Sequence, residues 1–168
     1  MMSRWLPFVL LSISSTVSAA PGQSPDPGVS TPAVSGVSIT LGQRAERMLQ
    51  LINSERGRLG RAPLALQPQL LESARSHNLY QARRSGITHQ GADGSWPWQR
   101  ANRHGFAGPA SENVGWSGRP GDSAISLHRV FMLSTGHRHN LLDARWRNAG
   151  IHFCWTRRGT YVCCVFGA

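Results

Sequence analysis

The sequence predicts an α+β fold in a single domain. Apolar residues recur at helical spacing in three long stretches, two of them over about residues 43–59 and 68–85, and the third ending before Gly136. Two apolar and aromatic runs close the chain, at 149–156 and 161–166. Helices followed by a terminal hairpin are typical of helices packed on a small antiparallel sheet. A length of 168 residues fits one such domain.

The chain begins with a stretch typical of an export signal, residues 1–19. Arg4 supplies a positive start, Trp5 to Ile13 form an apolar core, and Val17-Ser18-Ala19 is a small-residue cleavage site. The apolar run is shorter than the ~20 residues of a spanning helix, so we expect no transmembrane anchor after cleavage. Residues 20–40, rich in Pro, Gly and Ser, are predicted to be a flexible linker. Residues 41–168 then form the folded domain of a secreted or periplasmic protein.

The first two helices carry polar residues beside their apolar faces. Asn53 and Arg56 lie near the apolar stripe of the first helix, and we expect them to hold neighbouring loops by hydrogen bonds. Residues 64–66 are predicted to be a short extended link, and Pro68 suits the first turn of the next helix. His77 lies on the buried face of that helix, where a hydrogen-bonded core histidine is the expected role.

A short helix is predicted after the loop that holds His89. Ser95 is placed to cap this helix and Gly105 to end it. Arg100 lies within it, and we expect its side chain to anchor a loop.

Two further stretches carry side chains suited to a functional site. A predicted extended segment contains Glu112 and Asn113. The third long helix, capped by Asp122 or Ser123, leads into the heptapeptide 134–140, in which Gly136 stands where a helix C-cap is expected. On this interpretation His137 leaves the end of a helix and can face a cleft.

A set of motifs occurs in one order along residues 43–167: Asn53-x-x-Arg56, Ala74-x-x-His77, His89, Arg100, Glu112-Asn113-Val114-x-x-x-Gly118 and Ser134-x-Gly136-His137-Arg138-x-Asn140. This ordered set resembles the CAP superfamily (the cysteine-rich secretory, antigen 5 and pathogenesis-related 1 proteins) in its compact bacterial, SCP-like form. The resemblance implies a three-layer α-β-α sandwich. It also implies that the polar residues of these motifs support a cleft, namely Asn53, Arg56, His77, Arg100, Asn113, Ser134, Arg138 and Asn140.

The resemblance also suggests a metal-capable site. In larger family members, four residues line the cleft: two histidines and two acidic residues. By position, His89, Glu112 and His137 match three of these four, and Ser134 stands in place of the second acid. Neutral imidazole suits metals such as zinc. We therefore expect a weakly bound divalent metal, with Glu112 as third ligand or as the group that orients an imidazole. The alternative is a hydrogen-bond network without metal.

Charge and motifs restrict the function. The 18 basic residues are all arginine, and with 8 acids they give a net charge of +10, which favours anionic neighbours. Without a dense basic run or a nucleic-acid motif we do not expect nucleic acid to bind. The sequence lacks the H-E-x-x-H pattern of metalloproteases. Together with the resemblance, this favours a non-catalytic binding module for an envelope lipid, glycan or protein. The alternatives are a metal-dependent hydrolase of envelope or extracellular material and an arginine-driven binder of anionic polymers.

The three cysteines all lie in the predicted hairpin. If Arg158-Gly159 forms its turn, counting outward places Cys154 opposite Cys163. An exported protein meets oxidising conditions, so we expect a Cys154–Cys163 disulfide, with Cys164 free on the other face of its strand.

Overall fold

The computed structural model describes residues 41–118 and 123–168. The predicted signal peptide and linker, residues 1–40, and the predicted cap Asp122 lie outside the described residues. Within the described part of the chain, no helix is both long enough and apolar enough to cross a membrane.

The described residues form five helices and four strands, and most lie where the sequence predicts them. The helices are α1 (Leu41–Arg58), α2 (Pro68–Arg84), α3 (Pro97–Arg103), α4 (Ser123–Leu133) and α5 (Thr135–Leu141). The strands are β1 (Ala65–Leu66), β2 (Ala110–Ser117), β3 (Asn148–Thr156) and β4 (Gly159–Gly167).

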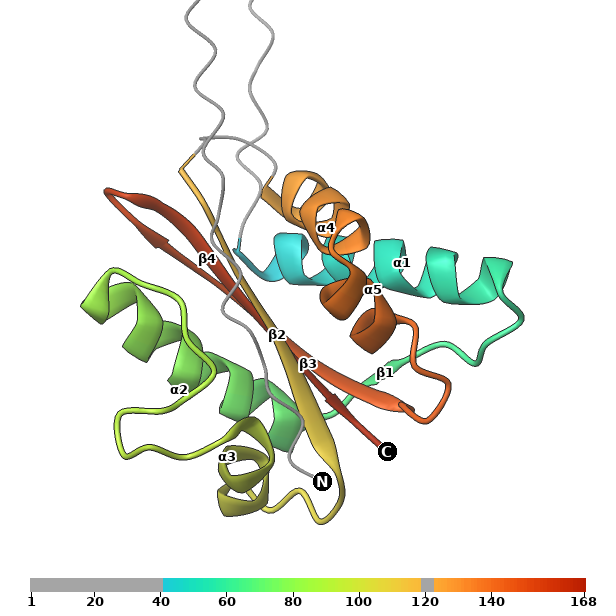
Figure 1. Ribbon diagram of the computed structural model, residues 1–168, viewed down its shortest axis with the longest axis horizontal. Helices are drawn as coiled ribbons and strands as arrows, with labels where there is room; N and C mark the ends of the chain where they lie inside the picture. The colour runs from blue at the N-terminus through green and yellow to red at the C-terminus, as the bar shows by residue number, and fades with distance from the viewer. Residues whose placement is uncertain (1–40, 119–122) are drawn as a thin grey trace, which may run out of the picture. The chain divides into compact units, whose positions relative to one another are not determined.

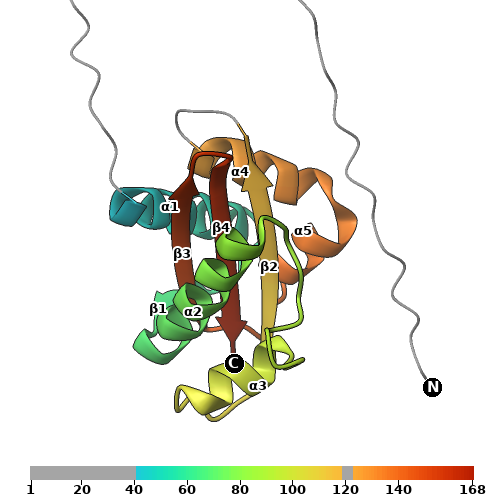
Figure 2. The same ribbon diagram turned by 90° about the vertical axis from the view of Figure 1, so that its left-hand side faces the viewer.

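The strands form one sheet between two layers of helices, which confirms the predicted three-layer sandwich (Figures 1 and 2). The strand order is β1-β3-β4-β2, so β2 is an edge strand. Pairing is antiparallel except between β3 and the two-residue β1, which run parallel. The sheet is thus mixed, because the predicted extended link after α1 aligns with the start of β3. Helices α1, α4 and α5 cover one face, and α2 and α3 cover the other (Figure 1).

Strand β4 contributes to the core on both faces, because successive side chains of a strand point to opposite sides. Cys164 and Phe166 pack under α1, α4 and α5, whereas Cys163 and Val165 pack under α2 and α3. All four side chains are fully buried. Because β4 is buried on both faces, its sequence is a nearly continuous run of apolar residues.

Gly150 allows α2 to lie directly on β3. A Cβ at this position would lie 2.0 Å from the carbonyl carbon of Leu70 and 2.1 Å from the backbone nitrogen of Leu71, both in α2. These are main-chain atoms, which a rotamer change cannot move. The helix and the strand therefore approach this closely only because residue 150 is glycine.

Two predicted helix boundaries are wrong. Gly136 does not end a helix: α4 ends at Leu133, Ser134 adopts extended angles (φ −88°, ψ 120°), and α5 begins at Thr135. Ser134 is therefore the N-cap of a new helix, and His137 lies within α5. At α3, the N-cap is Trp96 rather than Ser95.

The predicted Cys154–Cys163 disulfide is also wrong. The hairpin turns one residue earlier than expected, with Thr156 paired to Gly159, which adopts a φ of 125°. In this register Cys154 lies opposite Tyr161, and Cys163 lies opposite His152. All three cysteines are free thiols.

Candidate functional site

The candidate site is built around Glu112 on the edge strand β2. Val114, two residues further on, packs in the core under α2 and α3. Glu112 faces the same side, because side chains two residues apart in a strand share a face. Its side chain is 0% exposed. A charged group buried to this extent requires partners within the protein.

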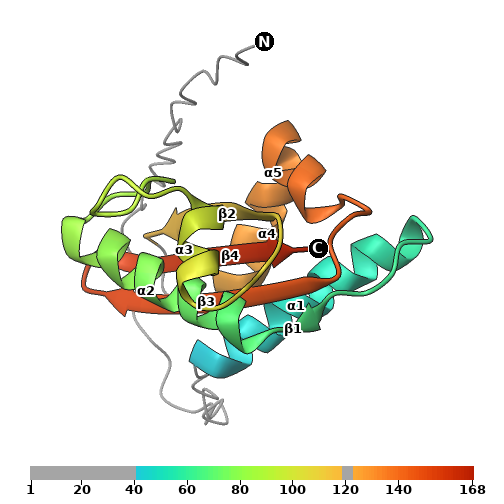
Figure 3. The same cartoon turned by 90° about the horizontal axis from the view of Figure 1, so that it is seen from below.

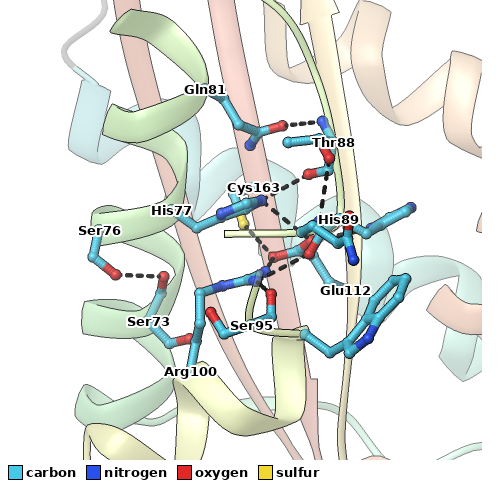
Figure 4. A network of polar contacts seen from close by, with 12 residues as sticks. Ser73, Ser76, His77, Gln81, Thr88, His89, Ser95, Arg100, Glu112 and Cys163 are labelled. Atoms are coloured by element: carbon cyan, nitrogen blue, oxygen red, sulfur yellow. Dashed lines mark hydrogen bonds and ion pairs between the residues drawn. The ribbon is translucent and has the colours of Figure 1, made fainter. Parts of the chain in front are cut away.

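Both carboxylate oxygens of Glu112 have such partners (Figure 4). Oε1 lies 3.0 Å from His89 Nδ1 and 3.6 Å from His77 Nε2. Oε2 accepts hydrogen bonds from Arg100 Nη2 at 2.6 Å and from the Cys163 thiol at 3.3 Å. The carboxylate is therefore surrounded by donors from α2, α3, β4 and the loop after α2.

Arg100 joins this carboxylate to the loop that carries His89. Besides its ion pair with Glu112, its guanidinium donates to the carbonyl of His89 at 2.9 Å and to that of Ser95 at 2.7 Å. Arg100 is itself only 6% exposed. The guanidinium fixes the main chain at His89 while neutralising the carboxylate that contacts the His89 ring.

The second helix holds the same loop from the other side. His77 Nε2 donates to the carbonyl of Thr88 at 2.7 Å. One turn later, Gln81 Oε1 accepts the backbone N–H of Thr88 at 3.0 Å. Two buried side chains of α2 thus fix the residue before His89. The His89 side chain remains 47% exposed.

The surroundings of Glu112 keep it ionised. Burial alone would raise its pKa, but the hydrogen bond from His89 and the nearby charges of His77 and Arg100 together lower it. Burial and the neighbouring carboxylate raise the pKa of the Cys163 thiol far above its usual value. Burial is also the main reason that the pKa of His77 is lowered. At neutral pH the site therefore holds a carboxylate, a neutral His77 and a protonated thiol.

His137 lies on the opposite side of β2, in the layer of α5. The side chain of Asn113, which faces that layer, donates to the carbonyl of His137 at 3.0 Å and accepts a hydrogen bond from Asn140 at 2.9 Å. The imidazole of His137 packs against Phe131, with ring centroids 4.9 Å apart. Its Nδ1 is buried and has no hydrogen-bond partner among the residues described.

The structure therefore brings the three predicted cleft residues only partly together. Glu112 contacts His89 directly, whereas the edge strand separates Glu112 from His137. Burial is the main reason that the pKa of His137 is lowered, and the neighbouring His89 adds to this effect. Among residues 41–118 and 123–168, no three His, Cys, Asp or Glu side chains are arranged to hold a metal ion.

The other predicted supporting residues hold loops at a distance from Glu112. Asn53 exchanges two hydrogen bonds with the backbone of Leu64, at 3.1 and 2.8 Å. Arg56, 0% exposed, donates to four main-chain carbonyls, those of Ala62, Leu141, Asp143 and Trp146. The Ser134 side chain makes no capping hydrogen bond, and Arg138 lines a separate pocket.

Two members of the site were not identified from the sequence. Gln81 follows His77 by four residues on the buried face of α2, a spacing that helical periodicity could have revealed. Cys163 becomes a partner of Glu112 only through the pairing of β2 with β4. No local sequence signal predicts that pairing.

Comparisons with known proteins agree with this fold. The profile of the cysteine-rich secretory protein family (CAP) matches residues 49–166. The uncharacterized protein YkwD of Bacillus subtilis is 25% identical over 149 residues, and the match covers 85% of this chain and 55% of YkwD. This chain thus spans about half the length of that relative.

Solved structures of bacterial proteins share the fold. An outer surface protein from Borrelia burgdorferi is 18% identical with a TM-score of 0.68, over 77% of this chain and 95% of that one. An extracellular protein containing an SCP domain from Bacillus anthracis is 19% identical with a TM-score of 0.67, over 75% of this chain and 40% of that one.

Proposed function

We propose a binding function for this chain, which belongs to the cysteine-rich secretory protein (CAP) family. Its fold is that of bacterial extracellular and surface proteins. From these relatives we infer that it acts outside the cell or at the cell envelope. Its partner there is an envelope lipid, glycan or protein, bound without being chemically altered.

The state of Glu112 is the observation that carries this proposal. A general acid or base must exchange a proton with its substrate. The side chain of Glu112 is 0% exposed, ionised and bonded within the protein through both oxygens. The neighbouring Cys163 is a protonated, fully buried thiol, which is a poor nucleophile. The arrangement supports a fixed anion that positions His89 rather than an acid–base pair.

His89 and His137 are the groups that fit a divalent metal such as zinc. Because ionised Glu112 only accepts hydrogen bonds, His89 Nδ1 donates to it, and in the neutral imidazole this leaves the Nε2 lone pair for a metal. A carboxylate behind a ligating imidazole is a common support in zinc sites. His137 has a lowered pKa and an unpartnered Nδ1, and so offers a second neutral imidazole. Two protein ligands without a third account for weak, reversible binding.

Calorimetry with zinc chloride tests this site. The full chain, freed of metal with chelator, is titrated at about pH 7.5, where unperturbed imidazoles are neutral. We expect weak binding that His89→Ala and His137→Ala each abolish. His139→Ala, an exposed histidine of the same helix, is the matched control and should bind zinc as the wild type does. No heat with the wild type, or equal affinity in the His89→Ala/His137→Ala double variant, would refute the metal site.

A second experiment separates binding from hydrolysis. The full chain is incubated with isolated cell-envelope fragments and washed at about 1 M salt, where the Debye length of ~3 Å suppresses nonspecific charge attraction. We expect the protein to sediment with the fragments, and His89→Ala to reduce retention. We also expect no release of soluble sugars, peptides or lipid products. Release that stops when chelator is added would instead establish a metal-dependent hydrolase.

A further inference from the structure

A pocket separate from the Glu112 site lies where the loop after α1 meets α5. Figure 3 shows that this loop and the loop after α5 lie at the same end of the sheet. The pocket has a volume of about 330 Å³. Its polar wall consists of Arg61 from the first loop, Thr135, Arg138 and His139 from α5, and Asp143 from the second loop.

Three of these residues belong to one face of α5. Thr135, Arg138 and His139 follow the three- and four-residue spacing of helical neighbours. His137 is off this face: its imidazole packs against Phe131 under α4. The pocket and the His89 site therefore use different sides of the same short helix.

The two arginines of the pocket are available to a ligand. The side chains of Arg61 and Arg138 have no hydrogen-bond or ion-pair partner within residues 41–118 and 123–168. The acid in the wall is already matched: Asp143 Oδ2 lies 2.6 Å from Arg145 Nη2, and Arg145 Nε lies 3.1 and 3.0 Å from the two carboxylate oxygens. The arginines thus carry an excess positive charge that the described wall does not neutralise.

A buried cation behind the wall adds to this excess. Arg56 is 0% exposed, and all its hydrogen bonds go to main-chain carbonyls, which include that of Asp143 at 2.9 Å. Its pKa is lowered first by burial and then by the positive charges of Arg61 and Arg147. Like charges are therefore crowded at this end of the domain, and an anion in the pocket would relieve their repulsion.

We propose that Arg61, Arg138 and Thr135 bind a phosphate group in this pocket. A guanidinium presents a planar fork of donors that matches two oxygens of a phosphate, and the threonine hydroxyl can donate to a third. Arg138 and Thr135 are exposed, so the phosphate can be free or can belong to a larger molecule such as a lipid headgroup. The site does not depend on the binding function proposed for His89 and His137.

Titration of the full chain with inorganic phosphate tests the site. We expect saturable binding, and we expect Arg61→Gln and Arg138→Gln each to weaken it by about tenfold or more, the range for a lost charged hydrogen bond. Arg129→Gln is the matched control, because it removes the same charge from an exposed position on α4. Unfolding midpoints should not fall in either pocket variant, since neither guanidinium has a partner to lose among the described residues and the removed charge only relieves repulsion.

Vesicles distinguish the two sources of the phosphate. Sedimentation with phosphatidylglycerol vesicles that is lost in Arg138→Gln and competed by inorganic phosphate identifies a lipid headgroup. Phosphate binding without vesicle binding identifies a free phosphate. The proposal is overturned if phosphate does not saturate, if the pocket variants bind like the wild type, or if Arg129→Gln weakens binding equally. A failed zinc titration would leave it intact.

Discussion

The ion pair between Arg100 and Glu112 should be the most costly contact of the candidate site to break. The two groups approach to 2.6 Å, and their side chains are 7% and 0% exposed. We consider three variants: Arg100→Met, Glu112→Gln, and the double variant. Each single change leaves one buried charge without its partner, whereas the double change removes both charges.

The structure sets the expected magnitudes. Without Arg100, the carboxylate keeps only His77, His89 and the thiol, and breaking a buried pair in this way costs about 3–5 kcal/mol. Without the Glu112 charge, the guanidinium still has the carbonyls of His89 and Ser95. Glu112→Gln should therefore cost less, about 1.5–3 kcal/mol, the value of a charged hydrogen bond. Since domains have only about 5–15 kcal/mol of stability, both losses are measurable.

Urea unfolding of the full chain at neutral pH measures these free energies. The double variant should lose at least about 1 kcal/mol less than the sum of the two single losses, because it leaves no unpaired charge. Arg103→Met is the control: its ion pair with Asp93 is exposed, and its removal should leave stability nearly unchanged. If the single losses add to within about 0.5 kcal/mol, the two groups are not coupled and the reasoning fails.

Two further predictions concern the fold. Burial is the largest cause that lowers the pKa of four histidines in the folded state, His77, His128, His137 and His152. The unfolded chain therefore takes up protons first, and the free energy of unfolding should fall as the pH drops below about 6.5, the ordinary pKa of an imidazole. Urea midpoints that stay constant from about pH 7 to 5 in the presence of chelator would contradict this. Gly150→Ala should destabilise the domain by about 3 kcal/mol or more, because the new Cβ meets the α2 backbone. Gly136→Ala, with no atom within 4 Å of its Cβ, should unfold at the wild-type temperature or slightly above it.

Local signals predicted most of the helices correctly, and long-range geometry explains what they missed. Apolar periodicity and Pro68 located α2 to within one residue of its observed end. At residues 134–140, the same kind of signal failed, because a glycine after an apolar run marks a C-cap only if it adopts positive φ. Gly136 is not among the described glycines that do so. Ser134, two residues before Gly136, adopts an extended conformation and separates two helices that the sequence pattern predicts as one.

The cysteine prediction failed for a related reason. Counting residues across a hairpin requires the turn to be known to the residue, and Arg157, Arg158 and Gly159 offer two plausible two-residue turns. The glycine at φ 125° pairs with Thr156 and ends the turn instead of forming part of it. This shift of one residue places Cys163 opposite His152 instead of opposite Cys154. The pairing of β4 with β2 then brings its thiol to Glu112. The sulfur then serves as a hydrogen-bond donor inside the site.

The separation of Glu112 from His137 follows from the two-residue period of β2. Adjacent strand residues face opposite sides of a sheet whatever strand pairs with them. Once Asn113 is placed against α5, as its hydrogen bonds to His137 and Asn140 require, Glu112 must face α2. The motif Glu112-Asn113 therefore divides its two functions between the two helical layers: the carboxylate positions His89, and the amide positions His137. On the α5 side the strand presents the amide of Asn113, which is a weaker ligand for zinc than an imidazole or a carboxylate.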